Sequence, residues 1–350
     1  MAKLGLIEGY YGEPWSDEAR ERVIAHLAPH GYRFFIYAPK ADAFLRRRWR
    51  EPFPPADEAR LRKLAEHCKA LGVSFGVGLS PYEAYRDFDV EAQVALAQKL
   101  DALDAVGIDM LAVLFDDMQG DLPELALTQA AILHWITART KAKHIVTAPS
   151  YYTDDPILDR IFGQRPENYL EDLGRALDPA IDIFWTGEEV CSREISVGHL
   201  SRVEGQLRRK PLLWDNYPVN DGPRMSQFLH LRGFTGRPAA IADHIAGHAI
   251  NPALQPTLTL IPALTLAETY MRGDSYAYGE AFVRAAEAVL GPQLARTLYE
   301  DLSILQDVGL DRLGGRARDL RDRYAGSDHP GAKEIVDWLA GKYRFTGEML

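Results

Sequence analysis

Two adjacent carboxylates, Asp116 and Asp117, follow the apolar run Met110–Phe115 and precede Gly120. Such a run is typical of a buried strand, and α/β folds place their chemistry where strands end and loops begin. Neighbouring strand side chains point to opposite faces, so both acids can serve one site only if the chain is already turning, a bend that Gly120 would allow. The pair indicates acid/base catalysis; the alternatives are a helix cap or a structural cation site.

Seven other apolar runs end in polar, aromatic or glycine residues. These ends are Glu8–Gly12, Tyr37–Lys40, Ser80-Pro81, Pro149–Tyr152, Trp185–Gly187, Trp214–Tyr217 and Asn251-Pro252. Aromatic rings stack on the apolar face of a pyranose, while amides and charged groups hydrogen-bond its hydroxyls. The set therefore favours a glycan site.

The elements that must position these residues alternate along the chain. The expected strands are Leu4–Glu8, Phe34–Ala38, Phe75–Leu79, Met110–Phe115, Ile145–Ala148, Ile181–Trp185, Leu212–Trp214 and His248–Ile250. The expected helices are Asp17–Leu27, Ala56–Leu71, Val90–Val106, Pro123–Thr140, Glu167–Leu177, Val197–Leu207 and Ala253–Tyr270. The less regular segment 225–244 is expected to be a helix-containing crossover.

Short strands alternating with helices predict an α/β fold, a (β/α)8 TIM barrel over residues 1–270. A doubly wound open sheet is the competitor, but no GxGxxG motif opens a helix. From residue 271 the pattern is helical only, at Tyr278–Leu290, Gln293–Gln306, Arg312–Tyr324 and Pro330–Tyr343. This predicts a small all-helical appendage over 271–350 that packs on the barrel or forms a homodimer contact.

Composition narrows the classes of partner. The 350 residues are 47% apolar and carry a formal net charge of −10, which argues against nucleic acid and anionic membranes as partners. Two cysteines, Cys68 and Cys191, are too few for a disulfide framework, so we expect two free thiols in packing roles. No leader or membrane-spanning pattern is evident, and we expect a cytoplasmic protein.

The ordered motifs resemble glycoside hydrolase family 84, the family of O-GlcNAcases and bacterial β-N-acetylglucosaminidases. They are Gly5–Trp15, Tyr37–Lys40, Trp49–Glu51, Leu114–Asp117, Trp185–Gly187, Trp214–Asn216, Asn220-Asp221 and Asn251-Pro252. The resemblance covers about residues 3–270, and residues 41–48 depart from the family pattern. It implies a retaining exo-β-N-acetylglucosaminidase that removes terminal GlcNAc from a protein or glycan through an oxazoline, without a cofactor.

The resemblance assigns distinct roles to the two acids. Asp117 matches the general acid/base, and Asp116 matches the carboxylate that orients the 2-acetamido group of the substrate. Adjacent carboxylates bias one another toward different protonation states, which supports this division. Retaining glycosidases commonly use a protein nucleophile, and substrate assistance is the exception that this pair fits.

The resemblance also implies a set of substrate-binding residues. Those expected to bond the sugar hydroxyls are Gly9, Lys40, Asn216, Asp221 and Asn251. Tyr152 is expected to contact the acetamido oxygen or the oxazoline, with Tyr151 as the alternative, and Trp214 and Val190 to wall the N-acetyl pocket. The competing structural roles are an ion pair for Lys40, loop fixing for the two asparagines and a helix N-cap for Asp221.

Two further clusters carry weaker signals. The basic stretch Arg46–Arg50 is expected to brace a loop or to meet an acidic aglycone rather than nucleic acid. His244 and His248 have i,i+4 spacing but lack the glutamate of HExxH, so no metal site is expected. Two other functions stay open: a glycan-binding protein on a decayed hydrolase barrel, and a metal-dependent barrel hydrolase.

Overall fold

The computed structural model describes residues 2–345, in which eight parallel strands form one closed barrel in chain order, with β8 paired to β1. The strands are β1 (Leu4–Glu8), β2 (Tyr32–Tyr37), β3 (Ser74–Leu79), β4 (Met110–Leu114), β5 (His144–Ala148), β6 (Asp182–Trp185), β7 (Leu212–Asp215) and β8 (Gly247–Ile250). Each begins and ends within two residues of a predicted strand. The predicted (β/α)8 barrel is confirmed.

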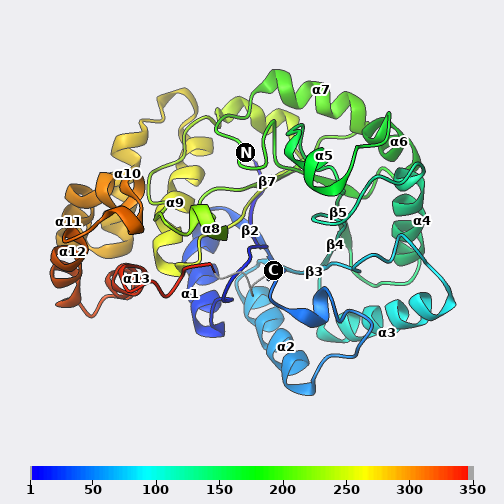
Figure 1. The fold of residues 1–350 in the computed structure, drawn as a ribbon, viewed down its shortest axis with the longest axis horizontal. Coiled ribbons are helices and arrows are strands. Elements are labelled where there is room, and N and C mark those ends of the chain that lie inside the picture. The colour runs from blue at the N-terminus through cyan, green and yellow to red at the C-terminus, as the bar shows by residue number, and fades with distance from the viewer. Residues whose placement is uncertain (1, 346–350) are drawn as a thin grey trace.

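Helices surround the barrel, as Figure 1 shows. They are α1 (Asp17–Leu27), α2 (Pro55–Ala70), α3 (Val90–Val106), α4 (Leu125–Thr137), α5 (Ile157–Phe162), α6 (Tyr169–Ala176), α7 (Val197–Leu207), α8 (Gly222–Met225) and α9 (Pro256–Arg272). Helices α1, α3 and α7 begin and end at the predicted residues. Ser16, Asp89 and Ser196 cap them by accepting a backbone N–H of the first turn, which explains why their starts could be read from the sequence.

The crossover between β7 and β8 is irregular and contains short helical pieces, as expected. Only α8 and a 3-10 turn at Ala239–His244 are helical there, and residues 226–238 are irregular. Gly236 takes a left-handed φ of 69° ahead of Pro238, a combination that does not continue a helix. Side chains satisfy the irregular backbone instead: Gln306 accepts the N–H of Leu231 at 2.9 Å. These long-range bonds are invisible in local periodicity.

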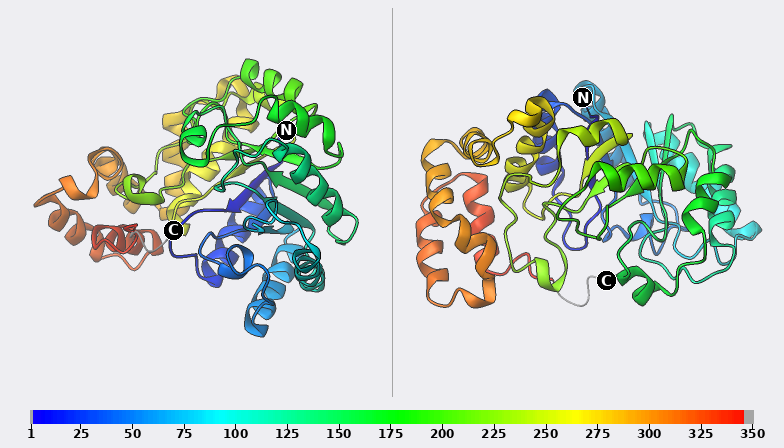
Figure 2. Two further views of the ribbon diagram at one scale, coloured as in Figure 1. Left: turned by 45° about the vertical axis from the view of Figure 1, so that its right-hand side comes forward. Right: turned by 90° about the horizontal axis from the view of Figure 1, so that it is seen from above.

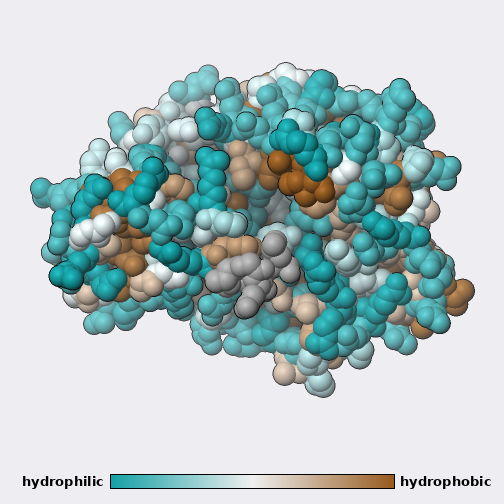
Figure 3. Space-filling view, viewed as in Figure 1, coloured by the Kyte–Doolittle hydropathy of each residue, from teal (hydrophilic) through white to brown (hydrophobic). Residues whose placement is uncertain are grey.

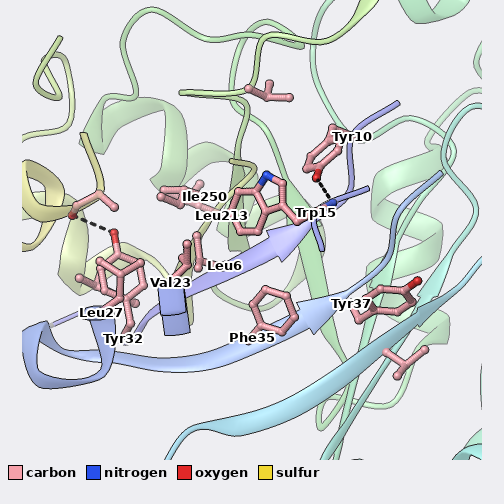
Figure 4. Close-up of a cluster of buried hydrophobic side chains, with 14 of the residues drawn as sticks. Leu6, Tyr10, Trp15, Val23, Leu27, Tyr32, Phe35, Tyr37, Leu213 and Ile250 are labelled. Atoms are coloured by element: carbon pink, nitrogen blue, oxygen red, sulfur yellow. Dashed lines mark hydrogen bonds between the residues drawn. The ribbon is translucent and has the colours of Figure 1, made fainter. Parts of the chain in front are cut away.

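Strand side chains alternate between the inside of the barrel and the layer beneath the helices. Ile7 and Ile36 belong to the buried cluster inside the barrel. Leu6 and Phe35, shown in Figure 4, belong to the larger buried cluster between strands and helices. The inner cluster also contains Trp214, at the C-terminal end of β7, so the top of the core is an aromatic side chain.

Four helices follow the barrel: α10 (Tyr278–Leu290), α11 (Pro292–Ser303), α12 (Arg316–Ala325) and α13 (Pro330–Leu339). They lie to one side of it in Figure 2. Glu334 of α13 is buried, and its carboxylate accepts the backbone N–H groups of Thr257 and Leu258 at 2.8 and 2.9 Å. It thereby caps α9, whose own N-cap residue, Gln255, makes no capping bond with its side chain. The boundary at residue 270 and the homodimer contact stay predictions.

Hydrophilic residues dominate the face of the molecule shown in Figure 3. Among the described residues 2–345, no helix combines the length and hydropathy needed to cross a membrane.

Candidate active site

A cavity of about 190 Å³ lies at the C-terminal ends of the barrel strands. All ten residues that the sequence nominates line it: Gly9, Lys40, Asp116, Asp117, Tyr152, Val190, Trp214, Asn216, Asp221 and Asn251. Six others also line it: Tyr11, Ala148, Phe184, Thr186, Cys191 and Val219. The structure thus brings the nominated residues together, while their individual roles stay predictions.

The backbone at Asp117 explains how two adjacent acids can face one cavity. Strand β4 ends at Leu114, and Asp117 takes a left-handed φ of 56°, a conformation that aspartate tolerates better than most residues. The chain therefore turns at Asp117 itself. The expected bend is present, but the left-handed residue is Asp117 and not Gly120; this glycine lies against the ring of Tyr151, where a Cβ would come within 2.7 Å.

Lys40 lies between the two acids. Its ammonium donates to Oδ2 of Asp116 and is 3.8 Å from Oδ2 of Asp117. The other oxygen of Asp116, Oδ1, is buried and has no hydrogen-bond partner within residues 2–345. A buried carboxylate oxygen without a donor is costly, so Asp116 offers a strong unused acceptor in a cavity wall. Lys40 does form the ion pair that was its structural alternative, but with a residue of the cavity.

Two phenols hold Asp117. Tyr11 donates its hydroxyl to Oδ2 at 2.9 Å, and Tyr152 donates to Oδ1 at 3.1 Å. Burial, followed by the nearby charge of Asp117, raises the pKa of both phenols, so both keep their protons as donors. Tyr11 was missed as a site residue. The signal for it was its place in the first strand-end motif, Glu8–Gly12.

Of the two tyrosines after β5, Tyr152 lines the cavity. Tyr151 is buried beside it, donates to the carbonyl of Gly163 at 2.6 Å, and packs edge-on against Tyr169 with ring centroids 5.4 Å apart. Geometry thus leaves Tyr152 as the candidate for the acetamido contact, which stays a prediction.

A chain of hydrogen bonds joins the loops after β1, β6, β7 and β8. The indole of Trp214 donates to Oδ1 of Asn216 at 3.0 Å, and Nδ2 of Asn251 donates to the same oxygen at 3.0 Å. Oδ1 of Asn251 accepts the N–H of Gly9 at 3.2 Å, and Nδ2 of Asn216 donates to the carbonyl of Val190 at 2.8 Å. The two asparagines do fix loops, and they do so while lining the cavity.

Asp221 does not cap a helix with its side chain. It precedes α8 without a side-chain capping bond, and its Oδ2 accepts the N–H of Tyr11 at 2.8 Å. Burial is the main cause that raises its pKa from 3.8 to about 6; the bond from Tyr11 opposes this, and the charge of Asp117 adds to it. The pKa of Asp221 is therefore raised well above that of an exposed carboxyl, so that it is ionised at pH 7 but protonated in mild acid.

Both cysteines are free, as predicted. Cys68 is buried in α2, but Cys191 lines the cavity rather than packing in the core, which corrects the expectation for it. Cys191 is exposed, yet the limited solvation of its thiol in the cavity wall, followed by the charge of Asp221, raises its pKa to about 11. It is therefore a protonated thiol at neutral pH and a poor nucleophile.

The two histidines with i,i+4 spacing, His244 and His248, have different partners. His248 in β8 has Nδ1 at 2.8 Å from the hydroxyl of Tyr270 and Nε2 at 3.0 Å from Asp215. Its ring nitrogens are thus both engaged. Within residues 2–345, no group of three histidine, cysteine or acidic side chains is placed to hold a metal ion.

A closed (β/α)8 barrel whose C-terminal rim holds paired carboxylates among aromatic and amide side chains is the architecture of a glycoside hydrolase. A family model described as beta-N-acetylglucosaminidase matches residues 4–303. The chain belongs to this family, glycoside hydrolase family 84.

Individual relatives agree with this assignment. The chain is 27% identical over 275 residues to "Protein O-GlcNAcase" of Mus musculus and of Rattus norvegicus, a match that covers 76% of this chain. It spans only 30% of the length of those two proteins. A mutant O-GlcNAc hydrolase from Thermobaculum terrenum superposes with a TM-score of 0.79 at 27% identity, covering 96% of this chain and 80% of that one.

Proposed function

We propose that this chain is a retaining exo-β-N-acetylglucosaminidase of the O-GlcNAcase type, acting on terminal β-linked GlcNAc through an oxazoline intermediate. The observation that carries the proposal is the pair Asp116-Asp117 in one cavity, with Asp116 paired to Lys40 and its Oδ1 free to accept. The relatives named O-GlcNAcase and O-GlcNAc hydrolase support the choice of sugar.

The cavity favours a terminal sugar. Its lining includes Ala148, Phe184 and Trp214, which also belong to the packed cluster inside the barrel. One end of the cavity is therefore closed by the core, and a glycan cannot thread through it. The pocket suits the last residue of a chain, and the glycosidic bond then faces the open side.

Asp116 would act on the acetamido group. Its unpaired Oδ1 can accept the N–H of the substrate, which aims the acetamido oxygen at the anomeric carbon and offsets the positive charge of the forming oxazolinium. Attack by this oxygen breaks the bond to the leaving group with inversion. Water then opens the oxazoline with a second inversion, so the β configuration is retained.

Asp117 would act on the leaving group. In its acid form it gives a proton to the departing glycosidic oxygen, and as the carboxylate it then takes a proton from the attacking water. Tyr152, which reaches the same carboxylate, is placed to contact the acetamido oxygen or the oxazoline. The remaining cavity residues, Lys40, Asn216, Asn251 and Asp221, would bond the sugar hydroxyls.

Two variants test the assignment of the acids. Asp117→Asn should lower kcat/KM by about 10² to 10⁴ for a phenyl glycoside and much less for an activated nitrophenyl glycoside, because an activated leaving group needs little proton donation. Asp116→Asn should cost heavily with both substrates. Asp121→Asn, on the same loop but outside the cavity lining, is the control and should keep full activity.

The N-acyl group tests substrate assistance directly. Fluorination of the acetamido methyl withdraws electron density from the attacking oxygen, so kcat/KM should fall steeply from the acetyl to the trifluoroacetyl substrate. A rate insensitive to fluorination would contradict the oxazoline route. Equal, minor losses for both acid variants would contradict the catalytic assignment, and binding without turnover would favour the glycan-binding alternative.

A further inference from the structure

We propose that Arg46 and Arg47, together with Tyr82, form a leaving-group subsite beside Asp117 that favours an aglycone carrying a carboxylate. This inference rests on the proposed function, because only a glycosidase has a leaving group to recognise. Arg46 and Arg47 belong to the basic stretch Arg46–Arg50, for which contact with an acidic aglycone was one of the two expectations from the sequence.

Two contacts place Arg46 next to Asp117. Its Nη2 is 3.5 Å from the carbonyl oxygen of Asp117, and its guanidinium lies 5.6 Å from the ring centroid of Tyr11. Tyr11 in turn donates its hydroxyl to the carboxylate of Asp117. The guanidinium is thus packed on the side chain that holds the proposed acid.

Arg46 and Arg47 share a second aromatic residue. Their guanidinium groups lie 5.6 and 4.9 Å from the ring centroid of Tyr82, in the loop after β3. Neither arginine nor Tyr82 lines the sugar cavity, whereas Tyr11 and Asp117 do. Because the acid protonates the oxygen that leads to the aglycone, residues beside Asp117 but outside the sugar cavity are the ones that the aglycone meets.

The charge of this cluster has no counterpart within residues 2–345. No carboxylate there lies within 4.0 Å of Arg46 or Arg47, while their neighbour Arg48 is paired with Glu51. Arg46 is buried, and its Nε has no hydrogen-bond partner among the described residues. A buried guanidinium normally has an anionic partner. A carboxylate suits it because the planar fork of N–H groups binds both carboxylate oxygens.

The negative charge around the subsite means that it should select a carboxylate only when that carboxylate is joined to the bound sugar. The chain carries a net charge of −10, and Asp116, Asp117 and Asp221 line the adjacent cavity. A free anion gains little from such a site, whereas a carboxylate joined to the bound GlcNAc is delivered to the arginines. The effect should therefore appear in kcat/KM for the glycoside rather than in binding of free carboxylates.

The test compares two aryl N-acetyl-β-glucosaminides with leaving groups of equal acidity, 4-nitrophenyl and a nitrophenyl bearing a ring carboxylate. At low salt the wild type should favour the carboxylate substrate by about fivefold in kcat/KM, the size expected of a partly solvated ion pair, and the ratio should fall as salt is raised. Arg46→Gln and Arg47→Gln should each bring the ratio toward one. Arg48→Gln is the matched control on the same loop and should leave the ratio unchanged.

The outcomes separate the inference from the function on which it rests. If Arg46→Gln lowers kcat/KM for both substrates equally and the ratio survives in both variants, Arg46 only braces Asp117 and the subsite is refuted. A wild-type ratio of one, independent of salt, refutes it as well. Failure to turn over either glycoside would refute the proposed function itself, and with it the subsite.

Discussion

Replacing Asp221 with asparagine should make the protein more stable at neutral pH while making it a worse enzyme. Burial holds the pKa of this carboxyl near 6, against 3.8 for the exposed group. A carboxyl with a raised pKa in the folded state contributes stability that is complete below pH 3.8 and is lost as the pH rises through about 6. Asparagine can still accept the N–H of Tyr11. Because its side chain does not ionise, the variant does not lose this stability as the pH rises.

The size of the effect follows from the shift. A difference of about 2 pKa units corresponds to about 3 kcal/mol at most between the two protonation states. For 350 residues, with an unfolding entropy of about 2.1 cal/mol/K per residue, this is an increase in Tm of roughly 4 °C. The stabilisation by Asp221→Asn should be near zero at pH 4 and reach this value above pH 7.

Scanning calorimetry of both proteins from pH 4 to pH 8 measures the difference, since other titrating groups are common to both. The activity should move the opposite way. If the ionised Asp221 accepts a hydrogen bond from a sugar hydroxyl, kcat/KM of the wild type should decrease as the pH is lowered through about 6. The Asp221→Asn variant should have a lower kcat/KM that shows no such decrease. Parallel Tm curves would show that Asp221 is not held as an unfavourable charge, and a variant with wild-type kcat/KM would remove it from the substrate site.

Three other substitutions test features of the scaffold. Gly9→Ala should lower kcat/KM by about 10²-fold, because a Cβ there would lie 2.3 Å from Cζ2 of Trp214 and displace the indole; unchanged steady-state kinetics would contradict the tight approach. Arg237→Leu should cost about 3–5 kcal/mol in urea unfolding at pH 7, because it strips Asp215 of the bidentate partner that, against the effect of burial, lowers its pKa to about 2. Glu334→Ala should cost about 1–3 kcal/mol by leaving two N–H groups at the start of α9 without an acceptor, and a smaller loss would mean that water replaces the carboxylate.

The strands and the candidate site could be predicted because their signals are local. The run Met110–Phe115 reads as a buried strand on its own, and parallel strands bring their C-terminal ends to one rim, so Asp116 and Asn251 were expected to meet although 135 positions separate them. The left-handed turn at Asp117 could not be predicted in this way. Its neighbours in the sequence allow an extended conformation equally well, and only the barrel context selects the turn.

The missed features depend on contacts between distant residues. Tyr11 joins the site because the first loop folds over the end of β4, which places its hydroxyl on Asp117. Arg46 belongs to the basic stretch that was expected to brace a loop or to meet an acidic aglycone, but the burial of its side chain among the rings of Tyr11 and Tyr82 could not be predicted from that stretch. In both cases the residue type was visible, but the direction of the side chain was set by loops without periodicity.

The hydrogen bonds that link Trp214, Asn216, Asn251 and Gly9 leave each side-chain amide only one orientation. An indole N–H can only donate, so the atom of Asn216 that meets it must be oxygen. Asn251 must then turn its nitrogen to that oxygen and its own oxygen to the N–H of Gly9. Each amide is left with one N–H uncommitted, and both rotamers are fixed before a sugar arrives. The two uncommitted N–H groups can therefore donate hydrogen bonds to sugar oxygens. Because both side chains are already fixed, binding avoids the entropy cost of about 0.5–1.5 kcal/mol for ordering each mobile side chain.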